Sequence, residues 1–189
     1  SLFFTWAQGL YQGFFNAYDG HVQMLDYPPG YFLPLWLIGA LSHAIDLEII
    51  SESLPLVQLI MKFLPILYNL GCALMVYKIA CLFSSEEVGL NAVTIWLVSP
   101  AILINCVWWG QIDTLLMLML MASYYLLEKD RPYAATIVFA FSCVTKFQTC
   151  FFLPVFVAAM LFKQPIKKTV FCGFIGAAVC FGVFLPFML

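Results

Sequence analysis

Charged residues are scarce in this chain of 189 residues, and this scarcity excludes most classes of protein. Only 10% of the residues are charged and 64% are hydrophobic, whereas a soluble domain is about 45–50% apolar and about 25% charged. The net charge of -2 also leaves no basic surface of the kind that binds nucleic acid. The composition therefore predicts a polytopic protein of the membrane bilayer with no nucleic-acid partner.

Signatures of soluble enzymes and of metal sites are also missing. The sequence contains no GxSxG, HExxH, GxGxxG or P-loop pattern. Its seven cysteines lie in apolar segments without a CxxC pair, and His21 and His43 stand apart from them. We expect these cysteines to pack as small apolar side chains rather than to form a metal or disulfide framework. No metal and no other cofactor is expected, although a divalent cation is compatible with the sequence.

The ends of the chain carry an expectation of their own. The chain begins at Ser1 without an initiator Met or a basic signal-peptide region, and it ends at Leu189 inside an apolar run. These ends predict a single-domain fragment of a longer membrane protein. Within it we expect residues 1–54 to form an outer loop with juxtamembrane helices and residues 55–189 to form transmembrane helices.

Five apolar stretches predict an all-α transmembrane bundle, because a helix needs about 20 mostly apolar residues to cross the bilayer core. They are 56–83, 88–109, 112–127, 133–162 and 169–189. The fourth stretch is too long for one helix, and two legs of about 15 residues would each rise only about 22 Å. We therefore expect a broken or re-entrant hairpin there, with Lys146, Phe147 and Gln148 at its tip.

Lysine and arginine residues set the expected orientation, because they accumulate in cytoplasmic loops. Lys78 lies near the end of the first stretch, Lys129 and Arg131 follow the third, and the last stretch is preceded by Lys163, Lys167 and Lys168. If these places face the cytoplasm, the residues before 56 lie outside. The apolar segment 31–45 then predicts an interfacial or re-entrant helix, and the aromatic segment 1–20 predicts an amphipathic helix at the interface.

Polar residues interrupt the apolar background in three places, and the first is the segment 25–31. It reads Leu-Asp-Tyr-Pro-Pro-Gly-Tyr. Two adjacent prolines restrict the backbone and remove two donors, so the segment is predicted to be extended and to open no helix before Gly30. It is either a stiff turn into the next helix or part of a site with Asp26 and Tyr27.

The second place runs from Trp108 to Asp113. As a structural element, Gly110 would end one helix, Asp113 would N-cap the next, and the tryptophans would form an interface belt. As a site, Gln111 and Asp113 would point into an outer cavity and hold sugar or phosphate-ester hydroxyls beside the ring of Trp109. The residues themselves leave both interpretations open.

The third place is Lys146 with Gln148, in the middle of the fourth apolar stretch. About a dozen apolar residues flank the lysine on each side, which makes it harder for the side chain to snorkel to an interface. An ionisable residue at membrane depth is a candidate for function, and an ammonium group is a point charge that suits a phosphate. We therefore predict that Lys146 contacts a lipid-linked phosphate.

These three segments, preceded by an aromatic helix with Trp6-Ala7, resemble the GT-C superfamily of integral-membrane glycosyltransferases in its bacterial multi-span branch. The matching residues are Asp26-Tyr27-Pro28-Pro29-Gly30-Tyr31, Trp109-Gly110-Gln111-Ile112-Asp113 and Lys146-Phe147-Gln148. A related Asp-Tyr-Pro-Pro segment occurs in the eukaryotic lumenal glucosyltransferases of N-glycan assembly. The resemblance extends from about Phe4 to Lys168. Phe147 departs from the pattern, because family members often have proline there.

The resemblance implies a hexosyltransferase-like enzyme of the bacterial plasma membrane that works on cell-envelope glycans. Such an enzyme takes a sugar from a polyprenyl phosphate and transfers it on the outer face, usually with inversion, to a hydroxyl of a lipid, glycan or protein. The expected substrate-binding residues are Asp26, Tyr27, Trp109, Gln111, Asp113, Lys146 and Gln148. The family's catalytic carboxylate lies upstream of the tryptophan that matches Trp6, at a position that falls before Ser1.

Two other interpretations stay open at this point. A transporter or flippase of lipid-linked substrates would also have broken helices and an intramembrane lysine. Against it, no internal repeat is visible, and a large outer loop with two prolines is rare in transporters. A noncatalytic membrane subunit would explain the hydropathy but not the grouping of Gln111, Asp113 and Lys146.

Overall fold

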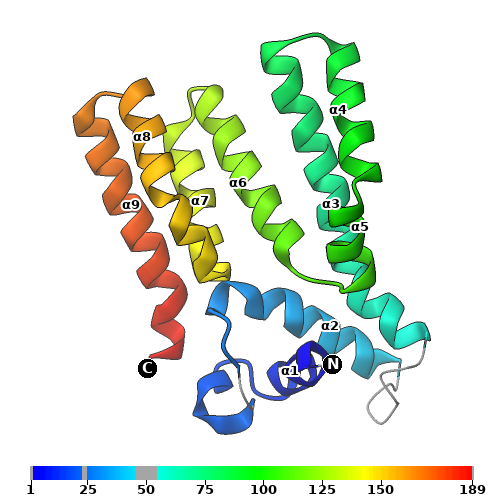
Figure 1. The fold of residues 1–189 in the computed structure, drawn as a ribbon. Helices are drawn as coiled ribbons and strands as arrows, with labels where there is room; N and C mark the ends of the chain where they lie inside the picture. Colours follow the sequence, from blue (N-terminus) through cyan, green and yellow to red (C-terminus); the bar gives the residue numbers. More distant parts are fainter. Residues whose placement is uncertain (1, 23–24, 46–54, 189) are drawn as a thin grey trace.

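Helices make up nearly all of the chain. The computed structural model describes residues 2–22, 25–45 and 55–188, and no strand occurs among them. Of these described residues, 86% are helical. Figure 1 shows the helices α3 to α9 standing side by side, with α1 (Leu2–Gln12) and α2 (Phe32–Ala44) across their lower end. The predicted all-α class of a membrane helical protein is confirmed.

Two helices among the described residues are long and apolar enough to cross a bilayer by themselves. They are α3 (Pro55–Phe83, 29 residues) and the helical run Ile166–Phe187 (22 residues), which joins α9 (Ile166–Phe184) to the short turn η5 (Leu185–Phe187). The predicted boundary at residue 54 lies outside the described residues.

A third candidate span is bent. The helix α4 (Glu86–Val98) and the helical segment Pro100–Trp108 meet at an angle of 51°, and this segment begins with α5 (Pro100–Leu103). The sequence predicted a span over 88–109, and this pair is a candidate for it, but the helix is interrupted at Ser99. Pro100 has no N–H for a helical hydrogen bond and favours an extended residue before it, and Ser99 has ψ of 120°.

The remaining helices are shorter, and two of them form the expected hairpin. The helix α6 (Asp113–Glu128) leads to α7 (Pro132–Thr145), and the 3-10 turn η4 (Phe147–Phe152) leads from α7 to α8 (Leu153–Lys163). Lys146 is extended at the point where α7 ends, with φ of -155° and ψ of 122°. The hairpin with Lys146 at its tip is therefore present, as the length of the apolar stretch predicted.

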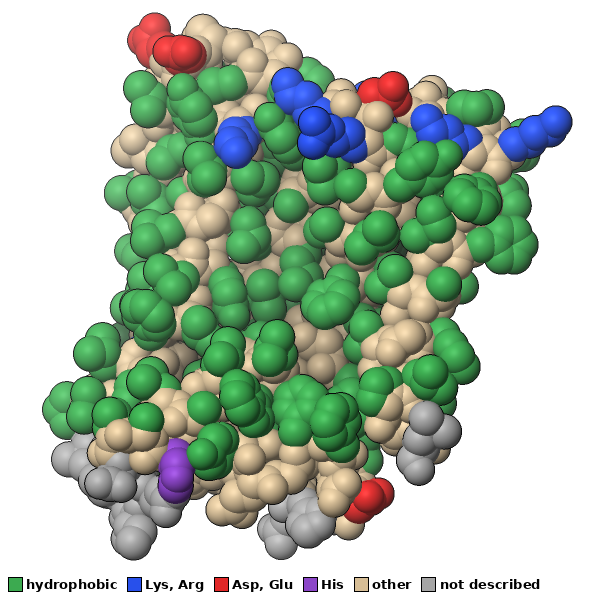
Figure 2. All heavy atoms as spheres, turned by 180° about the vertical axis from the view of Figure 1, so that it is seen from behind, with side chains coloured by type: hydrophobic (Ala, Val, Ile, Leu, Met, Phe, Trp, Pro, Cys, Tyr) green, Lys and Arg blue, Asp and Glu red, His purple; other side chains and the backbone are tan. Residues whose placement is uncertain are grey.

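The basic residues gather at the opposite end of the bundle. The connections α3–α4, α6–α7 and α8–α9 lie together at the upper end in Figure 1. Figure 2 shows a band of Lys and Arg side chains there, above a broad apolar zone. Six of the eight basic residues lie in or beside these connections or in the neighbouring end of α3. The other two are Lys62 and Lys146. The loops that the charge pattern assigned to one side do share one end.

The two N-terminal helices pack closely against each other at the lower end. Gly39 of α2 permits this contact, because a Cβ atom there would overlap the backbone of Ala7 in α1. Trp6 and Leu10 of α1 and Phe32 of α2 are buried between these helices and the bundle. As expected for the segment 31–45, α2 lies across the bundle instead of along it (Figure 1).

The helix predicted over residues 1–20 ends earlier than expected. The structure ends α1 at Gln12, and one π-helical turn follows at η1 (Ala17–His21). Gly13 directly follows the helix, and glycine is less favourable than alanine inside a helix by about 1 kcal/mol. The prediction is therefore correct for the first part of the segment and wrong beyond Gln12.

Candidate functional site

Lys146 and Asp113 form an ion pair at the lower end of the bundle. Lys146 Nζ lies 2.6 Å from Asp113 Oδ1, which connects the tip of the α7–α8 hairpin to the first residue of α6. The Lys146 side chain is 16% exposed and that of Asp113 is 43% exposed. Lys146 is thus held by a carboxylate at the edge of the protein interior, instead of extending freely as a snorkelling lysine would.

Asn105 fixes the same carboxylate from its other side. Asn105 Nδ2 donates a hydrogen bond of 2.9 Å to Asp113 Oδ2. The backbone oxygen of Asn105 accepts a bond of 3.0 Å from the Gln111 N–H. Asn105 lies in the π-helical turn η3 (Ile104–Trp108), a kind of turn that is frequent at functional sites. One residue therefore fixes both the backbone at Gln111 and the side chain of Asp113.

The turn that leads into α6 agrees with one structural prediction and corrects another. Gly110 follows the helical C-cap Trp109 and has φ of 66°, as expected of a glycine that ends a helix. Asp113 does not N-cap α6, because Ile112 holds that position and no side-chain cap bond forms. The Asp113 carboxylate faces Lys146 instead.

Tyr27 covers the ammonium group from the N-terminal segment. Lys146 Nζ lies 5.6 Å from the centre of the Tyr27 ring, a distance at which a cation–π contact forms. Burial raises the pKa of the Tyr27 hydroxyl above its ordinary value, and this effect outweighs the lowering by the nearby Lys146 charge. The phenol therefore stays protonated at neutral pH, where it can donate a hydrogen bond to a ligand.

The two prolines bring this segment against the end of α7. Gly30 lies in the 3-10 turn η2 (Pro29–Tyr31), and a Cβ there would lie only 2.6 Å from the backbone oxygen of Val144. The predicted start of this turn is wrong by one residue, because Pro29 suits a first helical position, where no N–H bond is lost. Gly30 therefore permits the close docking that places Tyr27 beside Lys146.

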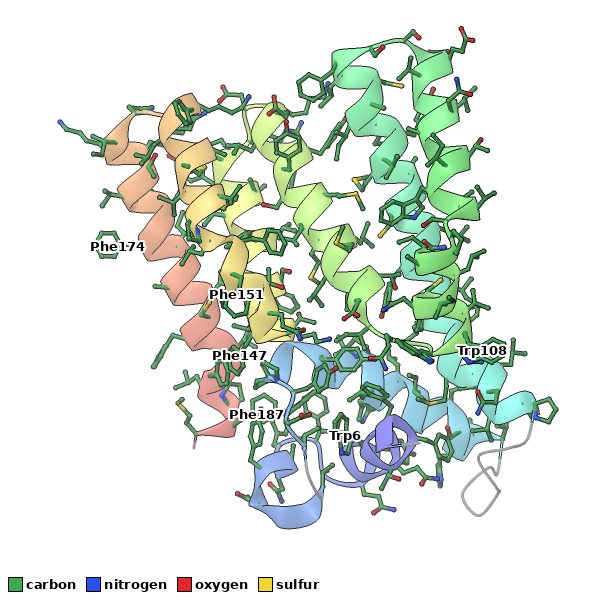
Figure 3. The ribbon with its side chains drawn as sticks, viewed as in Figure 1. Trp6, Trp108, Phe147, Phe151, Phe174 and Phe187 are labelled. Atoms are coloured by element: carbon green, nitrogen blue, oxygen red, sulfur yellow. The ribbon has the colours of Figure 1, made fainter. Side chains whose placement is uncertain are left out.

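Aromatic rings support Tyr27 from below. The rings of Phe3 and Trp6 in α1 meet it edge-on, with centroid distances of 5.7 and 5.6 Å. The ring of Tyr31 lies 5.5 Å away on the other side of the turn. Trp6 is only 2% exposed, and Figure 3 shows it below the bundle in the lower layer. This packing holds the Tyr27 ring in a fixed position.

A pocket of about 300 Å³ opens beside the ammonium group, and we name it the Lys146 pocket. It is lined by Asp26, Tyr27, Pro28, Lys146, Phe147 and Gln148. Four of the seven predicted substrate-binding residues thus meet here: Asp26, Tyr27, Lys146 and Gln148. A fifth, Asp113, acts on the pocket through its ion pair with Lys146.

The other two predicted residues line a different pocket of about 420 Å³, which we name the Lys62 pocket. Its lining includes Phe4, Gln58, Lys62, Trp108, Trp109 and Gln111. Figure 3 shows Trp108 at the α3 side of the lower end and Phe147 at the α9 side. The structure therefore divides the predicted set between two pockets, with Gln111 at one and Asp113 connected to the other.

Sequence reasoning missed two residues of this arrangement, Asn105 and Lys62. Asn105 is a polar residue inside the apolar stretch 88–109, which was the available signal for it. Its Oδ1 is buried and has no hydrogen-bond partner among the described residues. Lys62 interrupts the apolar stretch 56–83 near its start, which was the available signal for it. The sequence shows both polar residues inside apolar stretches, but it does not show which residues they contact.

Metal-binding groups do not gather anywhere in the described part of the chain. No three or more His, Cys, Asp or Glu side chains there are placed to hold a metal ion, and the seven cysteines are free thiols. The residues that surround Lys146 are hydrogen-bond donors, acceptors and aromatic rings. That the reaction needs no metal or other cofactor stays a prediction.

Comparison with known proteins identifies the family. The model of glycosyltransferase family 87 matches residues 25–189. No curated protein and no solved structure matches the chain. The matched range covers the Pro-Pro segment, both lysines of the pockets, Asn105 and Asp113, and it includes most of the chain. The chain belongs to glycosyltransferase family 87.

Proposed function

We propose that this membrane glycosyltransferase takes a hexose from a polyprenyl-phosphate carrier and transfers it, with inversion, to a hydroxyl of a lipid, glycan or protein. Family membership supports glycosyl transfer, and the resemblance to GT-C enzymes supports the lipid-phosphate donor. One observation carries the donor assignment. Lys146 is an ammonium group that Asp113 holds at the edge of a pocket in a membrane helical bundle.

Lys146 has the donors that a phosphate needs. An ammonium group has three N–H donors, and Asp113 accepts one of them at 2.6 Å. The Tyr27 hydroxyl is a second hydrogen-bond partner of the ammonium group, and the remaining donor is available to phosphate oxygens that enter the Lys146 pocket. As the bond from sugar to phosphate breaks, negative charge accumulates on the leaving phosphate. A fixed cation in a partly dry site stabilises that charge more strongly than bulk water would.

The proposed transfer exchanges one bond for another at the anomeric carbon. The acceptor oxygen forms a bond to this carbon from the face opposite the phosphate, and the carbon–oxygen bond to the phosphate breaks with its electron pair. A general base takes the acceptor proton and contributes about 100- to 10,000-fold. We do not assign this role to Asp113, because both of its carboxylate oxygens are engaged by Lys146 and Asn105.

An apolar pocket of about 320 Å³ supports a donor with a lipid tail. It lies between α6, α7 and α8, and its wall includes Met117, Leu120, Phe139, Phe152 and Phe156. Phe152 is the last residue of η4, the turn whose first residue directly follows Lys146. A prenyl chain in this pocket would leave its phosphate near the tip of the hairpin.

The distribution of charge supports an active site on the outer face of the bacterial plasma membrane. Basic residues mark cytoplasmic loops, and here they gather at the upper end of the bundle (Figure 2). Both the Lys146 pocket and the Lys62 pocket lie at the other end. In this orientation α1 and α2 belong to an outer loop of residues 1–54, and the transmembrane part comprises residues 55–189.

Family membership favours this enzyme over a transporter or flippase of lipid-linked substrates. The test uses the full-length protein in proteoliposomes, supplied with a panel of polyprenyl-phosphate hexoses and with the matching nucleotide sugars. We expect transfer from at least one polyprenyl-phosphate hexose and none from the nucleotide sugars. Transfer from nucleotide sugars would contradict the donor assignment. Movement of the lipid-linked sugar across the bilayer without transfer would favour the transporter.

A further inference from the structure

The Lys62 pocket presents a different chemistry from the Lys146 pocket. It combines two indole rings, Trp108 and Trp109, with the amide of Gln111 and the ammonium of Lys62. Trp108 is 76% exposed and Trp109 is 65% exposed, so the rings have open faces. Aromatic faces beside hydrogen-bond donors and acceptors suit a pyranose, because its C–H face packs on a ring while its hydroxyls form hydrogen bonds.

Lys62 is placed to face a ligand in this pocket. Among residues 2–22, 25–45 and 55–188, no carboxylate lies within ion-pairing distance of it. Its side chain lies against the turn at Gly110, where an added Cβ would come within 3.3 Å of Lys62 Cγ. Lys146 differs in having Asp113 as its ion-pair partner.

The two pockets are connected by one short segment. Gln111 lines the Lys62 pocket, and Asp113 pairs with Lys146. Ile112 between them is fully buried, with no exposed surface. Asn105 holds both neighbours, through its backbone oxygen and its side-chain amide. The distance between the pockets is therefore set by a fixed turn, as a reaction between two bound substrates requires.

We infer that the Lys62 pocket is an acceptor subsite that binds a pyranose ring. Trp109 packs on the ring, and Lys62 and Gln111 form hydrogen bonds with its hydroxyls. The assignment of this pocket to the acceptor rests on the proposed function. That proposal assigns the donor phosphate and its lipid tail to the region around the α7–α8 hairpin, which leaves the Lys62 pocket for the acceptor. The binding of a pyranose rests only on the chemistry of the pocket.

The test is saturation-transfer NMR on the full-length protein in lipid nanodiscs. The probes are the methyl and octyl glycosides of glucose, galactose and mannose. We expect the protein to saturate the ring protons of at least one pyranoside and excess undecaprenyl phosphate to leave this signal unchanged. Tighter binding of the octyl form supports a lipid-linked acceptor, and equal binding supports a soluble glycan or a glycoprotein.

Matched variants identify the pocket. Lys62→Met and Gln111→Ala should each weaken pyranoside binding by about tenfold, because each removes a hydrogen-bond partner. Lys146→Met and Gln148→Ala make the same chemical changes at the other pocket and should leave pyranoside binding within about twofold of the wild type. Each variant is compared with the wild type by size-exclusion profile and thermal unfolding, so that a misfolded variant is recognised.

Three results would overturn the inference: no pyranoside binds, undecaprenyl phosphate displaces it, or the Lys146 variant loses it as strongly as the Lys62 variant. The two proposals also fail separately. If no pyranoside binds while transfer from a polyprenyl-phosphate hexose persists, the subsite is wrong and the donor assignment stands. If pyranosides bind through Lys62 but no polyprenyl-phosphate hexose is used, the donor assignment is wrong and the subsite stands.

Discussion

Two lysine–carboxylate pairs of equal length lie at opposite ends of the bundle. At the upper end, Lys163 Nζ lies 2.6 Å from Glu128 Oε2, and at the lower end Lys146 Nζ lies 2.6 Å from Asp113 Oδ1. At the upper end the carboxylate is the more buried partner, with Glu128 14% and Lys163 36% exposed, whereas at the lower end the ammonium is, with Lys146 16% and Asp113 43% exposed. The two pairs therefore share a distance but not an environment.

Their other contacts show what distinguishes a structural pair from a candidate site. The upper pair joins the ends of α6 and α8, and Gln164 forms a further bond of 2.6 Å to Asp130 beside it. The lower pair has Asn105 on its carboxylate, Tyr27 over its ammonium and a pocket at its edge. Distance and opposite charge do not indicate function here, whereas the pocket and the additional partners do.

The largest expected effect comes from removing the lower ammonium group. Lys146→Met should reduce transfer from a polyprenyl-phosphate hexose by about 100- to 1,000-fold, because the charge on the leaving phosphate loses its fixed cation. Lys146→Arg keeps the positive charge but replaces the ammonium by a planar guanidinium, so it should retain more activity than the Met variant. Initial rates in proteoliposomes measure both. A Lys146→Met enzyme with the wild-type rate would remove Lys146 from the mechanism.

A smaller loss is expected when the Pro-Pro segment cannot dock. Gly30→Ala would place a Cβ 2.6 Å from the Val144 oxygen, and the displaced segment should lower transfer by about 10- to 100-fold through misplacement of Tyr27. Gly173→Ala is the matched control, because nothing lies within 4 Å of a Cβ there. Equal rates for the two alanine variants would show that docking at Gly30 has no role in transfer.

The next effect tests the residue that orients Asp113. Asn105→Ala removes a hydrogen bond to a charged group, an interaction of about 1.5–3 kcal/mol, so we expect transfer to fall by about tenfold or more. The exposed Asn91 of α4 provides a control substitution, Asn91→Ala, which should have no effect. Rates are compared after each variant is normalised to the amount of folded protein. Identical rates for both variants would contradict a positioning role for Asn105.

The smallest effect is expected at the upper pair. Lys163→Met removes a partly exposed ion pair at the end of the bundle, and exposed pairs contribute about 0–1 kcal/mol to stability. Transfer should stay within about twofold of the wild-type rate, and thermal unfolding should change little. The same two assays measure both quantities. A loss of transfer as large as that of Lys146→Met would mean that both ends of the bundle serve the reaction, and the contrast between them would disappear.

The sequence predicted the location of polar groups better than their contacts. The length of the apolar stretch 133–162 indicated a hairpin, because its residues cannot cross the bilayer twice as regular helices, and the structure places Lys146 at its tip. Lysine spacing likewise placed three loops at one end. Both predictions depend on chain length and charge along the sequence, which are properties that the sequence displays directly.

The contacts depended on backbone details that no pattern of residue types displays. The π-helical turn η3 brings Asn105 back onto Asp113, and the residues around it follow no distinctive periodicity. The burial of Ile112 turns Gln111 and Asp113 towards different pockets, whereas their spacing suggested one site. For the same reason, the end of α1 at Gln12 and the break at Ser99 followed local glycine and proline chemistry instead of overall hydropathy.

The most direct test of the central claim measures binding of the donor phosphate itself. Undecaprenyl phosphate is titrated into the full-length protein in nanodiscs, and the dissociation constant is compared among the wild type, Lys146→Met and Lys62→Met. We predict that Lys146→Met weakens binding by at least about tenfold, the loss of one charged hydrogen bond, while Lys62→Met changes it by less than about twofold. Equal affinity of the wild type and Lys146→Met, or a loss confined to Lys62→Met, would contradict the assignment of the donor phosphate to Lys146.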